Sequence, residues 1–376
     1  MEKEIPFSKE KLEEIKEEYQ TPFHLYDEKA IKENAKRFLK AFSWNQGFKE
    51  YFAVKATPNP FILKILKDIG FGADCSSLTE LLLAEEVGIT GEEIMFTSNN
   101  TPAEEYEKAR DLGAIINLDD ISHIPFLAEH GGIPELISFR YNPGNQRAGG
   151  FIMGNPAEVK YGLTREQIFA GLEEVRKRGV ERFGLHTFIA SNQLDPQYFI
   201  DTAEMMFELA VEVKDRLDIN LEFVNIGGGI GVPYRPEEEA VDLELVGQGI
   251  KNKYNEIIKE NNLDPLAIYM ECGRMITGPY GYLVSEVIHK KDIYKKHVGL
   301  DGSMNDLMRP GMYDAYHHIT VLGKEDEPKT ETYDVTGSLC ESIDRFAVDR
   351  DLPKIDIGDT LVIHDTGAHG HAMGFN

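Results

Sequence analysis

The sequence predicts an α/β protein in which a closed (β/α)8 barrel is followed by an all-β region. Two observations support this fold class. Between residue 49 and about residue 270, short β-branched or aromatic runs alternate with longer stretches of helical period. From Tyr280 onward the pattern changes to alternating strands broken by Gly and Pro. The length of 376 residues allows about two to three domains, so both parts can build a core.

The barrel is indicated by eight strand-like runs. Stretches of helical period separate them, for example at Leu78–Val87, Arg165–Arg178 and Pro196–Arg216. Eight parallel strands with outer helices form a closed barrel, and an open doubly wound sheet is the alternative because two of the runs are short. The predicted strands are Glu50–Val54, Gly72–Asp74, Glu93–Thr97, Ala114–Leu118, Glu135–Arg140, Arg182–Thr187, Leu221–Ile226 and Ala267–Met270.

The segments on either side of these runs have other patterns. An amphipathic segment with Leu12, Ile15 and Tyr19 on one face comes first, followed by an extended run and a helix from about Asp27 to Phe42. Strand patterns in the last third predict the all-β part of the chain. They lie at Tyr282–His289, His318–Leu322, Thr332–Val335 and Thr360–Asp365.

Composition narrows the classes of function. The formal net charge is −25, from 40 Lys and Arg against 65 Asp and Glu, and such a surface repels nucleic acid. No apolar run reaches the ~18 residues that a membrane span needs. The three cysteines, Cys75, Cys272 and Cys340, suggest neither disulfides nor a zinc site, and we expect no metal. We therefore expect a soluble protein of the cytoplasm.

Reactive residues follow the predicted strands, where a barrel of this kind places its active site. Lys55 ends an apolar strand, where desolvation is expected to lower its pKa and free the amine as a Schiff-base nucleophile. A lysine extending from a strand end to solvent is the alternative. The residues that follow the strands are Lys55, Asp74, Asn99, Asn100, Asn142, Ser191, Gly227–Gly229 and Glu271.

Two further positions fit the same chemistry. Gly227–Gly229 can present successive N–H groups to a phosphate, with the Ser191 hydroxyl as a further donor, although a Gly-rich run is also a common tight turn. Glu271 can face a protonated pyridine nitrogen, or form an ordinary ion pair with Arg274. A nucleophilic lysine, a phosphate loop and a ring-nitrogen carboxylate on one barrel together favour a pyridoxal phosphate site.

With these residues in view, the chain resembles the fold-type III, pyridoxal-phosphate-dependent decarboxylases, most closely the diaminopimelate decarboxylases. The likeness runs from about Thr21 to the last residue. Six motifs carry it in the family's order: Tyr51–Ala56, Asp74–Glu80, Gly227–Gly229, Glu271–Arg274, Asn305–Pro310 and Cys340–Ser342.

The resemblance implies a TIM-type barrel of residues 30–280 and a β-sandwich or β-barrel domain of residues 1–29 with 281–376, as in alanine racemase and ornithine decarboxylase. It implies that Lys55 forms the Schiff base with pyridoxal 5'-phosphate. It also implies a homodimer with shared active sites. The implied cofactor-binding residues are Lys55, Asp74, Phe188, Ser191, Gly228, Gly229, Glu271, Gly273 and Arg274.

The resemblance also implies how an amino-acid substrate is bound. Arg274, Arg309 and Tyr313 would hold a distal carboxylate, and Glu341 a distal ammonium. Cys340, reaching into the partner's site, would donate a proton to Cα after CO2 has left. Two guanidinium groups favour a substrate with a second carboxylate. The expected reaction is therefore decarboxylation of meso-2,6-diaminopimelate to L-lysine.

Departures from the family pattern keep other substrates open. Phe188 replaces the ring-stacking histidine, Cys272 a usual proline, and His369 a usual tyrosine. The family continues past the position of Asn376 with a tyrosine that touches the cofactor and a final strand, so either the chain is incomplete there or that edge is missing.

The alternatives are decarboxylation of carboxynorspermidine, ornithine, lysine or a secondary-metabolite precursor, and a non-catalytic binding protein of the same fold. A racemase is disfavoured, because the alanine racemases place an arginine where this chain has Glu271.

Overall fold

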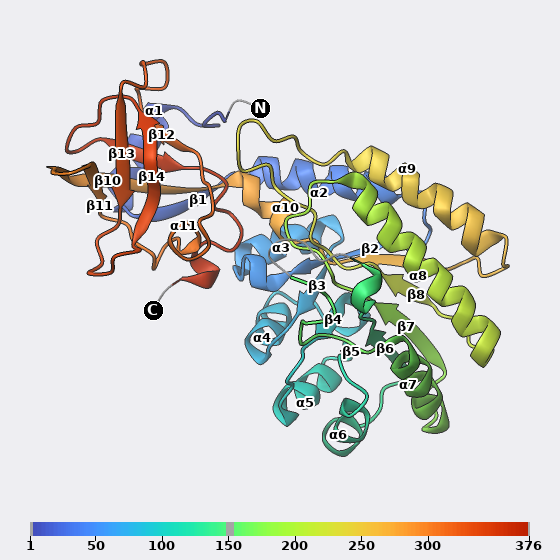
Figure 1. The fold of residues 1–376 in the computed structure, drawn as a ribbon. Helices are drawn as coiled ribbons and strands as arrows, with labels where there is room; N and C mark the ends of the chain where they lie inside the picture. Colours follow the sequence, from blue (N-terminus) through green and yellow to red (C-terminus); the bar gives the residue numbers. More distant parts are fainter. Residues whose placement is uncertain (1–2, 148–153, 375–376) are drawn as a thin grey trace. The chain divides into compact units, whose positions relative to one another are not determined.

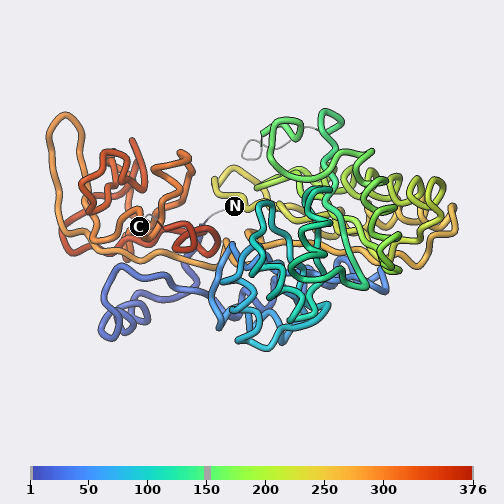
Figure 2. The backbone as a smooth tube through the Cα atoms, turned by 90° about the horizontal axis from the view of Figure 1, so that it is seen from below, coloured from blue at the N-terminus to red at the C-terminus, as the bar shows by residue number. Residues whose placement is uncertain are grey.

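The computed structural model describes residues 3–147 and 154–374, which form two compact units. We call Lys32–Gly231 with Val241–Ile276 the barrel unit, and Met1–Ile31 with Val232–Ala240 and Thr277–Asn376 the β unit. The domain boundaries at residues 30 and 280 stay a prediction. Figure 1 labels the elements of both units, and Figure 2 follows the backbone in a second view.

The barrel unit closes through eight parallel strands, each bonded to its neighbours in chain order and the last bonded to the first. This arrangement confirms the predicted barrel and rules out the open sheet. The strands are β2 (Lys49–Ala53), β3 (Gly72–Cys75), β4 (Ile94–Thr97), β5 (Ile115–Leu118), β6 (Leu136–Arg140), β7 (Arg182–His186), β8 (Phe223–Asn225) and β9 (Ala267–Met270).

Helices follow the barrel strands and cover them, as Figure 1 shows. Their ends carry the expected signals, such as Asn59 and Thr164 as N-caps and Gly70 in a left-handed conformation as a C-cap. Helices α8 and α9 lie side by side in both views. The helices are α2 (Glu28–Phe42), α3 (Pro60–Ile69), α4 (Leu78–Glu86), α5 (Ala103–Asp111), α6 (His123–His130), α7 (Arg165–Lys177), α8 (Pro196–Leu217), α9 (Leu243–Lys253), which continues as a π-helical turn (Tyr254–Lys259), and α10 (Arg274–Thr277).

Two layers of side chains fill the barrel, because every second strand residue points inward. The first layer is apolar and consists of Tyr51, Met95, Ile115, Leu136, Phe223 and Tyr269. It is tightly packed: a Cβ on Gly184 would lie 2.1 Å from an atom of the Phe223 ring. Two positions beyond Met95, Ile115, Leu136, Phe223 and Tyr269, the strands carry buried polar residues, and Asp74 and His186 follow Gly72 and Gly184 at the same spacing. This polar layer consists of Asp74, Thr97, Asn117, Ser138, His186, Asn225 and Glu271. The barrel therefore has an apolar floor beneath a polar layer.

The β unit is built on a seven-stranded sheet. Its main path runs β12-β15-β10-β11-β13-β14, β1 pairs with β10, and β11 and β13 are parallel. The strands are β1 (Phe23–Tyr26), β10 (Gly281–Asp292), β11 (Lys296–Leu300), β12 (Ile319–Val321), β13 (Glu331–Thr336), β14 (Arg345–Leu352) and β15 (Thr360–Ile363), and the helices are α1 (Lys9–Glu18) and α11 (Arg309–Tyr313).

Two strands of the β unit, β11 and β14, were not predicted from the sequence. The pairing of β13 with β14 shifts register near Tyr333–Thr336, and such irregularities disturb the alternation of buried and exposed residues on which strand prediction depends. Apart from these strands, the predicted fold class is confirmed. None of the helices in the described parts of the chain combines the length and hydropathy that a membrane crossing requires.

Two histidines, the buried His364 and the partly buried His318, make the stability of the β unit sensitive to acid. Burial lowers the pKa of His364 to about 3 and that of His318 to about 4. As pH falls below about 6.5, the unfolded imidazoles take up protons that the folded ones do not, so unfolding is favoured. For the buried His364, each pH unit between about 6 and 4 costs up to ~1.4 kcal/mol, and solvent screening makes the cost smaller for the partly buried His318.

We predict that His364→Gln reduces the fall in the free energy of unfolding between pH 6.5 and pH 4, because glutamine does not titrate in this range. Glutamine can also keep a hydrogen bond to Thr320. Urea unfolding followed by circular dichroism at several pH values measures this slope. His289→Gln, at an exposed position, is the matched control. A His364→Gln protein with the wild-type slope would contradict the prediction.

Candidate functional site

The polar layer opens into a cavity of about 180 Å3 at the carboxyl ends of the barrel strands. Four of the predicted site residues line it, contributed by different strands or by the turns that follow them: Lys55, Asp74, Phe188 and Glu271. The other residues that line it are Ser76, Thr97, Asn99, Arg140, Tyr161 and His186. The cavity thus brings together side chains from positions 55 to 271.

Lys55 lies in the single turn that follows β2. Its Nζ donates to Oδ2 of Asp74 at 2.9 Å and contacts Oγ of Ser76 at 3.4 Å. Burial alone would lower the pKa of Lys55, but the carboxylates of Asp74, Glu80 and Glu271 outweigh it and raise that pKa above the ordinary value. The predicted lowering of the Lys55 pKa was therefore wrong in sign, because these carboxylates come from distant parts of the chain.

Asp74 is buried beneath Lys55, and its Oδ1 has no hydrogen-bond partner among the described residues. Burial and the nearby Glu271 raise the pKa of Asp74, against the opposing effect of Lys55. A carboxyl group with a raised pKa next to an amine can exchange a proton with it.

Glu271 follows β9 and is held by two side chains of the polar layer. His186 lies with Nε2 3.0 Å from Oε2, and the Asn225 amide donates to Oε1 at 2.7 Å. Burial would raise the pKa of Glu271, but the contact with His186 and the cations of Lys55 and Arg140 lower it below the ordinary value. Glu271 is therefore an ionised carboxylate inside the barrel.

The hydrogen-bonded chain continues behind His186. The Asn117 amide donates to Nδ1 of His186 at 2.7 Å and to the Thr97 hydroxyl at 3.2 Å. With Nδ1 as the acceptor, the imidazole carries its proton on Nε2 and donates it to Glu271. Asn117, His186 and Asn225 had no predicted role. Each lies two residues beyond an inward-facing strand position, Ile115, Gly184 or Phe223, so the alternation of strand residues could have found them.

The remaining predicted cofactor residues gather at the ends of β7, β8 and β9. A Cβ on Gly228 would lie 2.0 Å from the Glu271 carbonyl oxygen, and one on Gly229 would lie 2.4 Å from that of Ala190. Only glycine allows these approaches. Nη2 of Arg274 lies 3.5 Å from the Ser191 hydroxyl, so a hydroxyl and a guanidinium adjoin the glycine loop.

These residues suit pyridoxal phosphate. The glycine loop with Ser191 and Arg274 offers donors for a phosphate group. Glu271 offers an ionised acceptor for a pyridinium N–H, and Lys55 an amine for the carbonyl carbon. The partnerless Oδ1 of Asp74 is a buried acceptor with capacity for one more donor.

Phe188, Arg140 and Tyr161 form one wall of the cavity. The Arg140 guanidinium lies 4.4 Å from the Tyr161 ring and 5.7 Å from that of Phe188, and it donates to Asp119 at 3.3 Å. The aromatic face of Phe188 is thus in the site, where the family's histidine is expected. Arg140 was missed because no motif contains it, although it ends a predicted strand.

Four other predicted residues belong to the β unit, and their roles stay predictions. Arg309 is buried, with Nη1 2.9 Å from Nε2 of His317 and its guanidinium 4.5 Å from the Tyr234 ring. Tyr313 and Cys340 are exposed. Glu341 accepts a hydrogen bond from the Ile343 N–H at 3.3 Å. No cluster of His, Cys, Asp and Glu in residues 3–147 and 154–374 is arranged to hold a metal ion.

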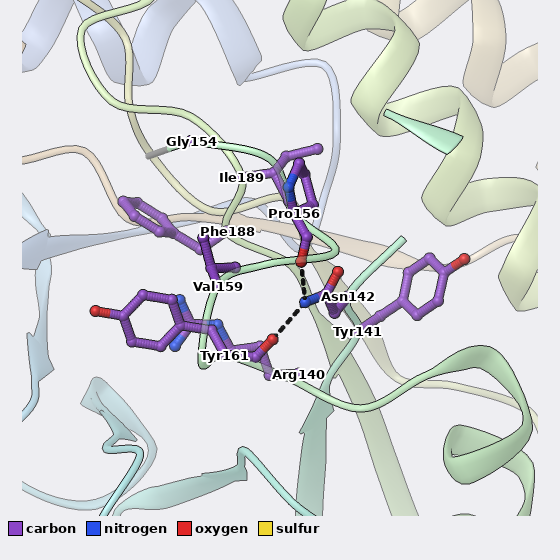
Figure 3. Close-up of a pocket in the computed structure, with 9 residues that line it drawn as sticks. All are labelled: Arg140, Tyr141, Asn142, Gly154, Pro156, Val159, Tyr161, Phe188 and Ile189. Atoms are coloured by element: carbon purple, nitrogen blue, oxygen red, sulfur yellow. Dashed lines mark hydrogen bonds between the residues drawn. The ribbon is translucent and has the colours of Figure 1, made fainter. Parts of the chain in front are cut away.

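Figure 3 shows how Asn142 holds the segment that carries Tyr161. Its amide donates to the Pro156 carbonyl at 2.8 Å and to the Tyr161 carbonyl at 2.6 Å, and its oxygen accepts from the Gly144 N–H. Asn142 was predicted only as a residue at a strand end. Its contacts indicate that it fixes the wall beside Phe188 rather than reacting.

We predict that Asn142→Ala frees this segment, because the two carbonyls lose their donor. Each lost hydrogen bond is worth ~1 kcal/mol. The backbone amides of residues 157–163 should therefore exchange their hydrogens at least about tenfold faster than in the wild-type protein. Mass spectrometry of exchanged peptides measures it. Asn145→Ala, which removes only a 3.4 Å contact with Asn155, is the control, and equal exchange in the two variants would contradict the role of Asn142.

Comparison with known proteins supports pyridoxal phosphate as the cofactor. A family model described as "Pyridoxal-dependent decarboxylase, pyridoxal binding domain" matches residues 28–278. Protein TabA of Pseudomonas amygdali pv. tabaci is 43% identical over 97% of this chain and 85% of its own length. Diaminopimelate decarboxylase of Methanothermobacter thermautotrophicus is 35% identical over 96% of this chain and 85% of its own length.

A solved structure extends the match to three dimensions. Diaminopimelate decarboxylase from Helicobacter pylori complexed with L-lysine superimposes with a TM-score of 0.88 at 31% identity, covering 97% of this chain and 90% of that one. The chain therefore belongs to the fold-type III, pyridoxal-phosphate-dependent amino-acid decarboxylases related to diaminopimelate decarboxylase.

Proposed function

We propose that this enzyme decarboxylates meso-2,6-diaminopimelate to L-lysine and CO2. The observation that carries the proposal is the ionised Glu271, held by His186 and Asn225 in the same cavity as Lys55. With pyridoxal phosphate bound, the Glu271 carboxylate would keep the pyridine nitrogen protonated, which favours loss of CO2 over racemisation. The choice of substrate is supported by relatives named diaminopimelate decarboxylase, such as the one 35% identical to this chain.

In the proposed mechanism each residue handles a proton or a charge. Pyridoxal phosphate supplies an acceptor for the electron pair that remains on Cα when CO2 leaves. Lys55 must lose its ammonium proton before its nitrogen can bond to carbon, and Oδ2 of Asp74, 2.9 Å away, is placed to accept it. Glu271 retains its negative charge because His186 and Asn225 donate to it.

The β unit supplies the substrate contacts in this proposal. Arg274 of the barrel unit with Arg309 and Tyr313 would bind the distal carboxylate, and Glu341 the distal ammonium. Cys340 would protonate Cα in the active site of a partner subunit, which requires a homodimer. Cys340 lies exposed in the segment between β13 and β14, where such a contact is accessible.

A second candidate is decarboxylation of another amino acid with a distal carboxylate or amine, such as carboxynorspermidine. The wall of Phe188, Arg140 and Tyr161 favours it, because Phe188 takes the place of the expected histidine and Arg140 adds a cation to the cavity. The higher identity to Protein TabA than to the Methanothermobacter enzyme, 43% against 35%, also leaves this substrate class open.

We predict that the purified protein with added pyridoxal phosphate releases CO2 from meso-diaminopimelate, and not from ornithine, lysine, arginine or carboxynorspermidine. Lysine is the expected second product, measured by chromatography against the rate of CO2 release. Lys55→Ala is the control, since it removes the amine and is expected to abolish both turnover and the absorbance of the bound cofactor.

Arg309→Lys tests the substrate assignment itself. Lysine keeps the charge but loses the guanidinium fork, so KM for meso-diaminopimelate should rise about tenfold or more, with a smaller change in the Kd for binding of L-lysine, which has no distal carboxylate. No turnover of diaminopimelate, with the cofactor absorbance present, would move the substrate to the second candidate.

A further inference from the structure

Glu50 has a fully buried carboxyl group that accepts one hydrogen bond from the described residues. It precedes Tyr51 on β2, so it points away from the barrel interior, toward the layer between strands and helices. It is 0% exposed, and its Oε1 accepts from the Cys272 N–H at 2.5 Å. Its Oε2 has no partner among the described residues. Burying such a group is costly, which calls for an explanation.

The partner of Glu50 lies in the turn that carries the cofactor residues Glu271, Gly273 and Arg274. The carbonyl oxygen of Glu271 is packed against Gly228, and Gly273 is packed against Ala53 and Ala56. Cys272 also adjoins the glycine loop, because a Cβ on Gly228 would lie 3.3 Å from the Cα of Cys272. Cys272 therefore links Glu50 of β2 to the Glu271–Arg274 turn and to the glycine loop. These are the two segments expected to surround the phosphate.

The charge state of Glu50 fits this arrangement. Burial raises its pKa well above the ordinary value, and the carboxylates of Glu271 and Asp74 raise it further. A neutral carboxyl can accept the Cys272 N–H without placing a second negative charge behind Glu271. Gln is the isosteric neutral replacement, whereas Leu removes the acceptor.

We propose that Glu50 is a positioning residue of the cofactor site, which fixes the Glu271–Arg274 turn against the glycine loop through the Cys272 N–H. It acts behind the residues that touch the cofactor and is not itself catalytic. The proposal does not depend on which amino acid is the substrate. It also predicts that the residue at position 272 matters for its N–H, which proline lacks.

Binding of pyridoxal phosphate to the apo protein tests this role without turnover. Its Kd follows from absorbance titration, and visible circular dichroism of the bound cofactor reports its orientation. Glu50→Leu and Cys272→Pro should each weaken binding about tenfold and change the dichroism, because each leaves a buried polar group unpaired. Glu50→Gln and Cys272→Ser, which keep the acceptor and the N–H, should stay within about twofold of wild type.

The double variant Glu50→Leu with Cys272→Pro tests whether the two residues act through the same hydrogen bond or whether each substitution disturbs the site separately. It removes both partners, so its Kd should be no weaker than that of either single variant. If the two effects multiply, or if Cys272→Pro and Cys272→Ser bind equally, the proposal is overturned. The Cys272 pair decides the question even if Glu50→Leu does not fold.

Discussion

An ionised carboxylate inside a barrel is the constraint on which the site depends. Glu271 is 4% exposed, and burying an unpaired charge costs several kcal/mol. Hydrogen bonds from His186 of β7 and Asn225 of β8 offset this cost. Further contacts run from His186 through Asn117 to Thr97. These residues come from separate strands, so Glu271 can keep its charge only when the barrel is closed. Fold and chemistry are therefore coupled through one buried group.

The two layers of the barrel have different roles: the apolar layer packs the core, and the polar layer holds the reactive side chains. The apolar layer, with Tyr51, Phe223 and Tyr269, fills the lower barrel as an ordinary core does. The next inward-facing positions, two residues further along the strands, include Asp74, His186 and Glu271. On every barrel strand except β2, where Ala53 follows Tyr51, a two-residue step therefore leads from the apolar layer to a polar side chain. Lys55 lies beyond this polar layer and lines the cavity. The glycine loop also depends on close packing, because its backbone lies directly against the carbonyl groups of Glu271 and Ala190.

The sequence was sufficient for the barrel, and four of the residues that it predicts for the site, Lys55, Asp74, Phe188 and Glu271, line one cavity. Strand period and reactive residues at strand ends are local signals, which is why the sequence carries them. It was insufficient where the outcome depends on tertiary contacts. Lys55 illustrates this, since desolvation was foreseen but the carboxylates of Asp74 and Glu271 reverse its effect on the pKa. Glu50 was missed because a charged residue on the covered face of a strand resembles an exposed one in sequence. The roles of Arg309, Tyr313, Cys340 and Glu341 rest on resemblance alone.

The most direct test of the central claim is the single-turnover rate of CO2 release by Glu271→Gln, saturated with pyridoxal phosphate and substrate. Glutamine preserves the size of the side chain but carries no charge. We predict that the cofactor still binds and that the rate falls at least about a hundredfold, because the charge that would keep the pyridine nitrogen protonated is lost. A rate within a few-fold of wild type, with the cofactor bound, would contradict the claim that the buried charge of Glu271 drives the reaction.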